Sequence, residues 1–511
     1  MKNIILGIGI LILIYTISSF KKEQTIAEEL SSTFGNDSYL EIDTLTLDSI
    51  FLKTLDSLSS KLNHSQEIRH FYAGNGNRPT FLLNFYKNGS IDSLINYLNS
   101  SSQNHGLNPE IFFTSELDSL LKVFKSDSTS SLAASYHNLA KLELLTAGAY
   151  LKYINSLQFG VVNPGKIFPK FHIVLKQQRK EQIIKLLNTE NLIDSLAKVQ
   201  PHSYQYKALQ QAYLEASNPA TKKVLAVNLE RLRWVLPAIG PEYIQVNIPA
   251  FQLVYIKNND TLSHMKVCVG EKKELNDDKK LLDLKKRKNN QDPPTDHETP
   301  ILLSKVTRLY TNPVWNIPES IIRREILDMA KSNRSYLKKN SISVFRNNKR
   351  INNTRNIRWS AYQDKDIPYR FVQEAGPNNA LGKLKFFFEN NSSIYLHDTN
   401  NKKAFKLANR AVSHGCIRLE HPLILAQLLV KEPQKLNEEL GLNATGLSII
   451  EQAKKKKQKQ LAVKPTLFNT QKPLPLIINY FTAWQENNKI EYRPDVYGYD
   501  EQLWAAINII K

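Results

Sequence analysis

The sequence predicts a multidomain protein with a mainly α-helical front half and a β-rich back half. The chain has 511 residues, which is enough for two to four structural units. Between residues 65 and 240, apolar residues recur at three- and four-residue steps, which is typical of helices. From residue 241 onward, apolar and polar residues alternate in short runs, which is typical of strands.

The first 22 residues predict a targeting segment. Lys2 precedes an almost wholly apolar run from Ile4 to Ile17, and two lysines follow shortly after it. A basic start and an apolar stretch of this length are typical of an export signal, or of a membrane anchor where the segment is not cleaved. We therefore expect residues 1–22 to take the chain to a membrane.

The helical half is expected to begin after a stalk. Residues 23–64 are rich in Ser, Thr, Asp and Glu, which favours a loosely ordered stalk or a first weak helix. Residues 65–240 predict a helical scaffold domain. In it, apolar residues from Leu139 to Tyr153 share one helical face, and a second helical run from Tyr204 to Val235 is broken by an Asn-Pro pair.

The β-rich half is expected to span residues 241–505. Its first strand is marked by alternation of Ile244, Val246 and Ile248 with polar residues. Residues 271–299 are charged and contain prolines, which predicts an exposed insertion. Further strands are expected at 251–257, 264–269, 302–310, 383–388, 393–397 and 475–482, and helices at 321–331, 335–339 and 422–430.

The charge balance favours anionic partners. Lys and Arg outnumber Asp and Glu by 68 to 48, which gives a formal net charge of +20. Nucleic acid, acidic lipid and a carboxylate-rich polymer would all suit such a surface. The sequence has no zinc finger, RNA-binding signature or phosphate-binding Gly-rich loop, so we expect no nucleic acid partner. The four lysines at 454–457 predict a solvated helix face.

One short segment carries the groups that nucleophilic catalysis needs. The run 412–418 reads VSHGCIR, and His397 lies nineteen residues before Cys416. A thiol becomes a good nucleophile when it is deprotonated, and a nearby imidazole can take its proton. Gly415 permits close approach of a substrate, backbone N–H groups beside it can stabilise an oxyanion, and Arg418 can bind a carboxylate.

The residues alone leave other interpretations open. Cys268 lies in an apolar strand and is expected to be structural. A zinc site formed by Cys416, His414, His397 and His421 is a further alternative, although no ligand pair has the spacing of a known zinc motif. A papain-like peptidase requires the cysteine before the histidine in the chain, which is the reverse of the order here. The chemistry alone therefore predicts a cysteine–histidine enzyme of unspecified class.

A resemblance narrows the class. The segment SHGCIR, preceded by His397, resembles the signature of YkuD-type L,D-transpeptidases in both order and spacing. Over residues 65–505 the chain is similar to the large, membrane-linked branch of that family, which has an N-terminal helical scaffold domain. The small peptidoglycan-binding module common in that branch is not recognisable here. The similar segments are GLNP at 106–109, GVVNP at 160–164, NLER at 228–231 with RW at 233–234, VNIPAF at 246–251, NPVWNIP at 312–318, GPNNALG at 376–382 and YFTAW at 480–484.

The resemblance implies a fold and a reaction. The fold would be a YkuD-like β-sandwich with a helical capping lobe at residues 318–382. Cys416 would form a thioester with a tetrapeptide stem and release D-alanine, His397 would act as the base, and the N–H groups of Gly415 and Cys416 would bind the oxyanion. An amine of a second stem would then complete a 3→3 cross-link in peptidoglycan.

The resemblance also implies roles around this pair. Arg418 would recognise a stem carboxylate and Ser413 would order the loop, whereas Asp398 is expected to be an exposed turn acid, with orientation of His397 as the alternative. The remaining expected substrate contacts are His414, Trp315, Asn316 and Asn379.

No metal or organic cofactor is expected. The expected partners are peptidoglycan stem peptides and, through an uncleaved N-terminal segment, the inner membrane, so the protein would work in the periplasm or cell envelope. A carboxypeptidase, an enzyme that anchors envelope proteins and a non-catalytic wall-binding scaffold remain as alternatives.

Overall fold

Two units make up the chain in the computed structural model, which describes residues 24–126, 132–272, 297–362, 366–442 and 464–509. The first unit consists of the described parts of 1–162, 176–235 and 504–511, and the second of those of 163–175 and 236–503. The predicted targeting segment lies outside the described residues. No helix that the structure describes is both long and apolar enough to cross a membrane.

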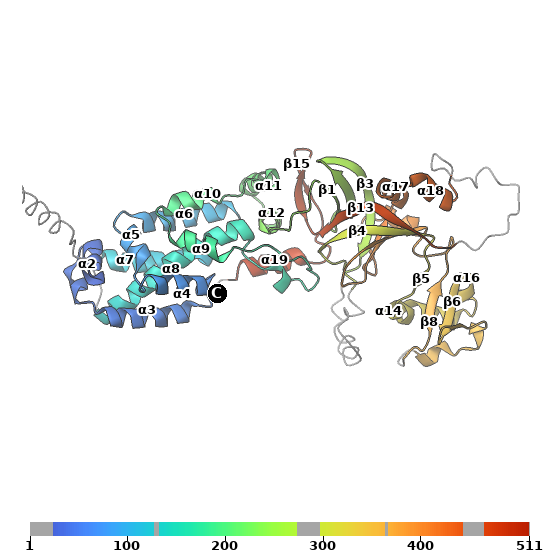
Figure 1. The fold of residues 1–511 in the computed structure, drawn as a ribbon, viewed down its shortest axis with the longest axis horizontal. Helices are drawn as coiled ribbons and strands as arrows, with labels where there is room; N and C mark the ends of the chain where they lie inside the picture. Colours follow the sequence, from blue (N-terminus) through green and yellow to red (C-terminus); the bar gives the residue numbers. More distant parts are fainter. Residues whose placement is uncertain (1–23, 127–131, 273–296, 363–365, 443–463, 510–511) are drawn as a thin grey trace, which may run out of the picture. The chain divides into compact units, whose positions relative to one another are not determined.

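The first unit is a bundle of helices around α8, Leu132–Phe159 (Figure 1). Every residue from Leu142 to Tyr150 is buried, because neighbouring helices cover α8 on all sides. The predicted apolar face from Leu139 to Tyr153 lies in this core. The other helices are α2 (Ile26–Phe34), α3 (Thr44–Leu58), α4 (Ser65–Gly74), α5 (Thr80–Phe85), α6 (Ser90–Asn104), α7 (Thr114–Lys125), α9 (Lys180–Leu187), α10 (Leu192–Lys198), α11 (Tyr204–Glu215) and α12 (Pro219–Arg233).

Where a stalk was expected, at residues 23–64, the structure has helices that belong to the bundle. Helix α3 packs against α8, and Phe51 and Leu55 on its inner face are each only 1% exposed. Asp43 caps α3 by accepting a hydrogen bond from the Thr46 N–H at 2.8 Å. The apolar residues of α3 are few, but they recur at helical spacing and so form one buried face. The expectation of a stalk considered only the polar composition of the segment.

A buried ion pair lies within α12, between Arg233 and Glu230. Arg233 donates to the Glu230 carboxylate from Nε at 3.0 Å and from a terminal nitrogen at 2.7 Å, and both side chains are fully buried. Glu230 also accepts hydrogen bonds from the backbone N–H groups of Val161 and Val162, at 2.7 and 3.1 Å. This carboxylate therefore joins the end of α8 to α12.

We expect Glu230→Gln to lower the free energy of unfolding of the helical unit by roughly 3–5 kcal/mol, because it leaves the Arg233 charge buried without its counter-charge. Urea denaturation followed by circular dichroism would measure this. Asp118→Asn, which breaks the exposed Lys122–Asp118 pair, is the matched control and should cost less than about 1 kcal/mol. Similar losses in both variants would contradict the assigned role.

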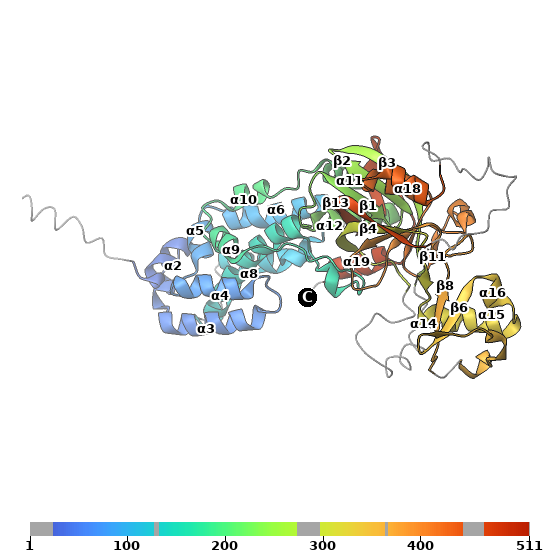
Figure 2. The same ribbon diagram turned by 45° about the vertical axis from the view of Figure 1, so that its right-hand side comes forward.

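The second unit is built on one nine-stranded sheet with the order β11-β3-β12-β10-β9-β4-β13-β1-β2. Figure 2 labels its strands β1, β2, β3, β4, β11 and β13. Strand β2 also pairs with β3, which closes the sheet into a ring. Pairing is antiparallel except for β1–β13, β10–β12 and β11–β3. The strands are β1 (Glu242–Asn247), β2 (Gln252–Lys257), β3 (Asp260–Gly270), β4 (Leu302–Thr311), β9 (Leu384–Phe388), β10 (Leu396–His397), β11 (Ala411–Ser413), β12 (Ile417–Leu419) and β13 (Thr466–Asn479).

A small lobe interrupts this sheet between β4 and β9. It has its own four-stranded sheet, in the order β5-β8-β6-β7, and its own apolar core around Val344 and Phe371, both 0% exposed. Its elements are β5 (Trp315–Asn316), α14 (Glu319–Ile321), the π-turn Ile322–Ile326, α15 (Leu327–Ser332), α16 (Tyr336–Lys339), β6 (Ile342–Arg346), β7 (Lys349–Arg350) and β8 (Arg370–Gln373). The predicted capping role of residues 318–382 stays a prediction.

The predicted division into a helical front half and a strand-rich back half is confirmed, with differences in detail. Strand β10 is shorter than expected, and β13 begins earlier, at Thr466. Of the expected exposed insertion at 271–299, the C-terminal end is buried, because His297, Glu298 and Thr299 are 5%, 9% and 0% exposed. At its N-terminal end, Glu271 is partly exposed and Lys272 is exposed, as expected. The four lysines at 454–457 and most of the insertion lie outside the described residues. Two helices and a hairpin complete the unit: α17 (Pro422–Leu429), α18 (Pro433–Glu439), β14 (Ala483–Glu486) and β15 (Lys489–Tyr492), before α19 (Tyr499–Ile507).

Candidate active site

The predicted nucleophile and base lie at two neighbouring parallel strands. In the register of β10 and β12, Leu396 lies opposite Ile417, and His397 lies opposite Arg418. The Ile417 N–H donates to the Tyr395 carbonyl at 3.0 Å. Cys416 directly precedes β12, so the sulfur lies beside the start of the strand that ends in His397.

Cys416 is partly buried and its sulfur has several polar neighbours. Burial raises the pKa of the Cys416 thiol above its usual value. Hydrogen bonds from the backbone and hydroxyl of Tyr395 oppose this rise, as do the positive charges of Lys385 and Arg418. Near neutral pH the thiol therefore keeps its proton until a base removes it.

His397 is held as a neutral imidazole. The side chain is 5% exposed, and its Nδ1 contacts the Asp398 carbonyl oxygen. A carbonyl only accepts, so Nδ1 carries the proton and Nε2 has a free lone pair. Burial lowers the pKa of His397 to about 3, and the nearby charges of Arg418, Lys385 and Lys402 contribute to this. At neutral pH the ring is therefore uncharged and its Nε2 lone pair is available, although a pKa this low makes it a weak base.

The Asp398 side chain does not orient His397, which was the alternative considered from the sequence, and the residue is 9% exposed rather than the exposed turn acid that was expected. Its carboxylate accepts a hydrogen bond from the Lys383 N–H at 2.8 Å and forms an ion pair with Lys402 at 2.6 Å. The main-chain carbonyl of Asp398 contacts the imidazole instead. Because a backbone carbonyl holds the His397 ring, any residue at position 398 can supply this contact.

Ser413 and Gly415 shape the loop before Cys416. Ser413 Oγ donates to the Cys416 carbonyl at 2.6 Å and accepts from the Gly415 N–H at 3.2 Å. Gly415 has φ +108°, a backbone conformation that side chains with a Cβ rarely adopt. The predicted oxyanion donor on Gly415 thus points to Ser413 in this state. The Gly415 carbonyl oxygen accepts a hydrogen bond from Thr299 Oγ1 at 2.8 Å, which joins the loop to the segment that contains Thr299.

The other predicted contacts lie either close to Cys416 or against or within the lobe. Arg418 is close enough to Cys416 and His397 to influence both, and Trp315 forms a hydrogen bond with Tyr395 next to the sulfur. His414 contacts Glu325 of the lobe, with 2.8 Å between Nε2 and Oε1. The Asn316 side chain accepts from Arg370 at 3.1 Å on an exposed part of the lobe.

Asn379 does not line an open cleft. The residue is 0% exposed, and its amide nitrogen donates to the carbonyl oxygens of Pro313, Gln373 and Glu374 at 2.9, 3.3 and 3.0 Å. Its Oδ1 accepts from the Leu381 N–H at 2.8 Å. All hydrogen-bonding positions of the side chain are used internally, so Asn379 stabilises the return from the lobe to β9.

We expect Asn379→Ala to lower the free energy of unfolding by about 2–4 kcal/mol, because buried carbonyl and N–H groups lose their partners. Chemical denaturation would measure the loss. Asn378→Ala, at the exposed neighbouring amide, should cost less than about 1 kcal/mol. Equal stability of the two variants would contradict the structural role of Asn379.

Tyr395 and Lys385 were not selected from the sequence as site residues. Lys385 on β9 lies opposite His397 on β10, and its ammonium is 3.6 Å from the centre of the Tyr395 ring. Burial lowers the pKa of Lys385, while the neighbouring Cys416 raises it. The sequence offers one signal for Lys385, a single charge in the otherwise apolar run LKFFF of β9.

Lys385→Gln should raise the pKa of Cys416 further, because it removes a positive charge that stabilises the thiolate. Since only the thiolate is alkylated, the rate of iodoacetamide labelling at pH 8 should fall several-fold. Mass spectrometry in chelator-treated buffer would follow the labelling, with Lys383→Gln as the matched control. A faster reaction in the Lys385 variant would contradict the assigned contribution of its charge.

Comparisons with known proteins agree with this arrangement. Residues 241–435, which include the β10–β12 site, match the family model described as the L,D-transpeptidase catalytic domain, YkuD. Residues 66–212 match the model described as the Scaffold domain. A Haemophilus influenzae protein named "Putative L,D-transpeptidase" is 33% identical over 286 residues, which are 55% of this chain and 49% of that protein. The match thus spans about half the length of that curated relative.

Proposed function

The chain belongs to the L,D-transpeptidase family, with a YkuD catalytic domain and a Scaffold domain, and from this premise we propose that it cross-links peptidoglycan through an acyl-enzyme on Cys416. The observation that carries the proposal is the pairing of β10 with β12. It brings the segment of Cys416, whose thiol has a raised pKa, next to the strand that ends in His397, a neutral imidazole whose Nε2 has a free lone pair.

In the first half-reaction, Cys416 Sγ attacks the carbonyl carbon of the third residue of a tetrapeptide stem. His397 Nε2 takes the thiol proton and then gives it to the departing amine of D-alanine. The C–N bond breaks, a thioester forms, and no redox change occurs. The neutral state of His397 supports this step, since a protonated ring could not accept the proton.

In the second half-reaction, an amine on the third residue of another stem, expected to be meso-diaminopimelate, attacks the thioester. His397 takes a proton from the amine, the new amide bond forms, and the thiol of Cys416 is regenerated. The product is a 3→3 cross-link. Water as the acceptor would instead give a tripeptide, and an amine of an envelope protein would give an anchored protein.

Substrate recognition is proposed to rest on charge and on an aromatic wall. Arg418 can present parallel N–H donors to a stem carboxylate next to the catalytic pair. Trp315, held by Tyr395, can cover the sulfur from the side of the lobe. Its position supports the predicted capping role of residues 318–382, which would exclude water from the thioester.

The proposed place of action is the cell envelope. The family acts on the cell wall, which lies outside the cytoplasm. The basic and apolar order of residues 1–22 supports export, and the net charge of +20 suits a wall polymer that carries carboxylates.

The test is product analysis of the full chain with purified disaccharide-tetrapeptides by mass spectrometry. We expect a dimer joined through the third residues of both stems, with release of D-alanine. Tripeptide without dimer would reassign the protein as a carboxypeptidase. Dimers joined from the fourth residue of the donor would contradict the proposed specificity.

A further inference from the structure

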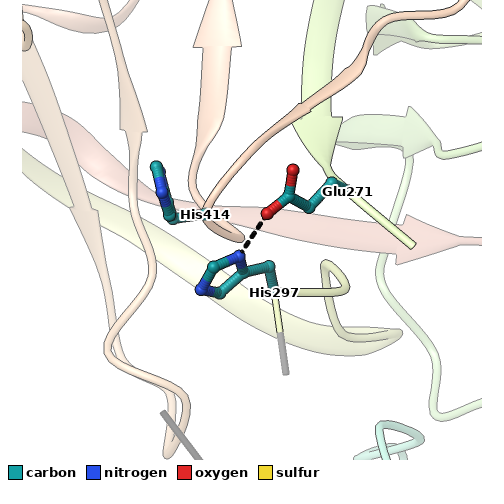
Figure 3. A group of neighbouring side chains, drawn as sticks. All are labelled: Glu271, His297 and His414. Carbon is teal, nitrogen blue, oxygen red and sulfur yellow. Dashed lines mark hydrogen bonds and ion pairs between the residues drawn. The ribbon is translucent and has the colours of Figure 1, made fainter. Parts of the chain in front are cut away.

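A second cluster of chemically active side chains lies beside the catalytic loop. Glu271, His297 and His414 converge, and one nitrogen or oxygen atom from each lies within 4.8 Å of the others (Figure 3). Glu271 Oε1 is 2.6 Å from His297 Nδ1, and the two histidine rings have centroids 4.6 Å apart. The catalytic account above gives none of these three groups a chemical task.

Backbone contacts fix the segments that carry the cluster. A Cβ on Gly270 would lie 1.7 Å from the His297 carbonyl oxygen, so only glycine lets these two segments approach so closely. The Gly270 N–H donates to Thr299 Oγ1 at 2.8 Å, and Thr299 Oγ1 donates to the Gly415 carbonyl at 2.8 Å. The two ends of the segment between β3 and β4 are thus joined to each other and to the catalytic loop by hydrogen bonds within the protein.

We propose that Glu271, His297 and His414 form a binding site for a divalent ion of the Zn²⁺ class. Two imidazoles and one carboxylate are a ligand set that suits zinc, whereas Mg²⁺ and Ca²⁺ require mostly oxygen ligands. A small separation of Glu271 from His297 would replace their hydrogen bond by bonds to the ion. This set shares only His414 with the zinc alternative considered from the sequence.

Glu325 supplies the outer contact that metal-bound histidines usually have. Its Oε1 lies 2.8 Å from His414 Nε2, so it can fix the ring while the other nitrogen faces the ion. Because Glu325 belongs to the lobe and His414 lies two residues before Cys416, an ion here would clamp the nucleophile loop between the lobe and the segment of His297.

Arg324 competes for the same place. One of its terminal nitrogens lies 3.2 and 3.3 Å from the two ring nitrogens of His297 and 3.9 Å from Glu271 Oε1. A guanidinium and a divalent cation repel each other at such distances. The Arg324 side chain is 41% exposed, so it can turn toward solvent when the ion binds. Removal of Arg324 should therefore strengthen metal binding.

The test is calorimetric titration of Zn²⁺ alone into the full chain carrying Cys416→Ser, which removes the catalytic thiolate as a competing ligand. We expect one ion per chain and a rise in the melting temperature. Adding His297→Gln should weaken binding at least tenfold, whereas adding Arg324→Gln should tighten it. These readouts do not depend on the transpeptidase reaction.

His421→Gln is the matched control, because His421 is 55% exposed and pairs with one carboxylate, Glu420 at 3.6 Å, outside the cluster. It should leave the affinity unchanged. Since His297 is buried and its replacement could disturb folding, Glu271→Gln, at a side chain 45% exposed, must also weaken binding. No binding, or equal losses in the His297 and His421 variants, would overturn the proposal.

Discussion

Cys416→Ala should abolish both the acyl-enzyme and every cross-linked product. The sulfur forms the covalent bond in the proposed mechanism, and a methyl group cannot replace it. Loss of the nucleophile in enzymes of this kind lowers the rate by about 10⁴-fold or more. Product formation from disaccharide-tetrapeptides, quantified by mass spectrometry, should therefore fall to the level of the reaction without enzyme.

The second cysteine provides an internal control for this result. Cys268 is 0% exposed and lies on β3, opposite Arg418 on β12. Cys268→Ala should retain cross-linking, because its sulfur has no access to a substrate. Substantial cross-linked product from Cys416→Ala would contradict the assignment of the nucleophile. So would loss of cross-linking in Cys268→Ala but not in Cys416→Ala.

His397→Gln should slow acylation by roughly 10²–10⁴-fold, the usual contribution of a positioned general base. Glutamine can still donate to the Asp398 carbonyl oxygen, but its amide cannot accept the thiol proton. The measurement is the single-turnover rate of thioester formation, followed by rapid quenching and intact-protein mass spectrometry. Substrate affinity should change much less than this rate.

The pH profile gives the His397 prediction a second readout. Because burial holds the pKa of His397 near 3, the intact protein should keep its base deprotonated from pH 5 upward. The single-turnover rate should therefore show no fall centred near pH 6.5. A fall there would contradict the low pKa of His397. A loss below tenfold in His397→Gln would show that another group accepts the proton.

The sequence could predict Cys416 and His397 as a catalytic pair because their signal is local. The run before Arg418 and the upstream His397 are recognisable from residue identity and spacing alone. The division into helical and strand-rich halves follows in the same way from the periods of the apolar residues. Both predictions depend on neighbours along the chain rather than on neighbours in space.

The misjudged details depend on contacts between distant segments. Asn379 resembles a substrate residue in sequence, yet its partners come from Pro313 and from the end of β8. Lys385 reaches the site only because β9 pairs with β10, a pairing that no local pattern specifies. The same reason applies to His297, whose segment was expected to be exposed but is buried against Gly270 and Gly415.

The central claim is that Cys416 becomes acylated by a peptide stem, and intact-protein mass spectrometry of the full chain with a tetrapeptide donor and no acceptor tests it most directly. The account predicts one adduct with the mass of the stem lacking its terminal D-alanine, which proteolytic mapping places on Cys416. The adduct should be present in Cys268→Ala and absent from Cys416→Ala. An adduct on any other residue, or turnover without an adduct that quenching can trap, would contradict the account.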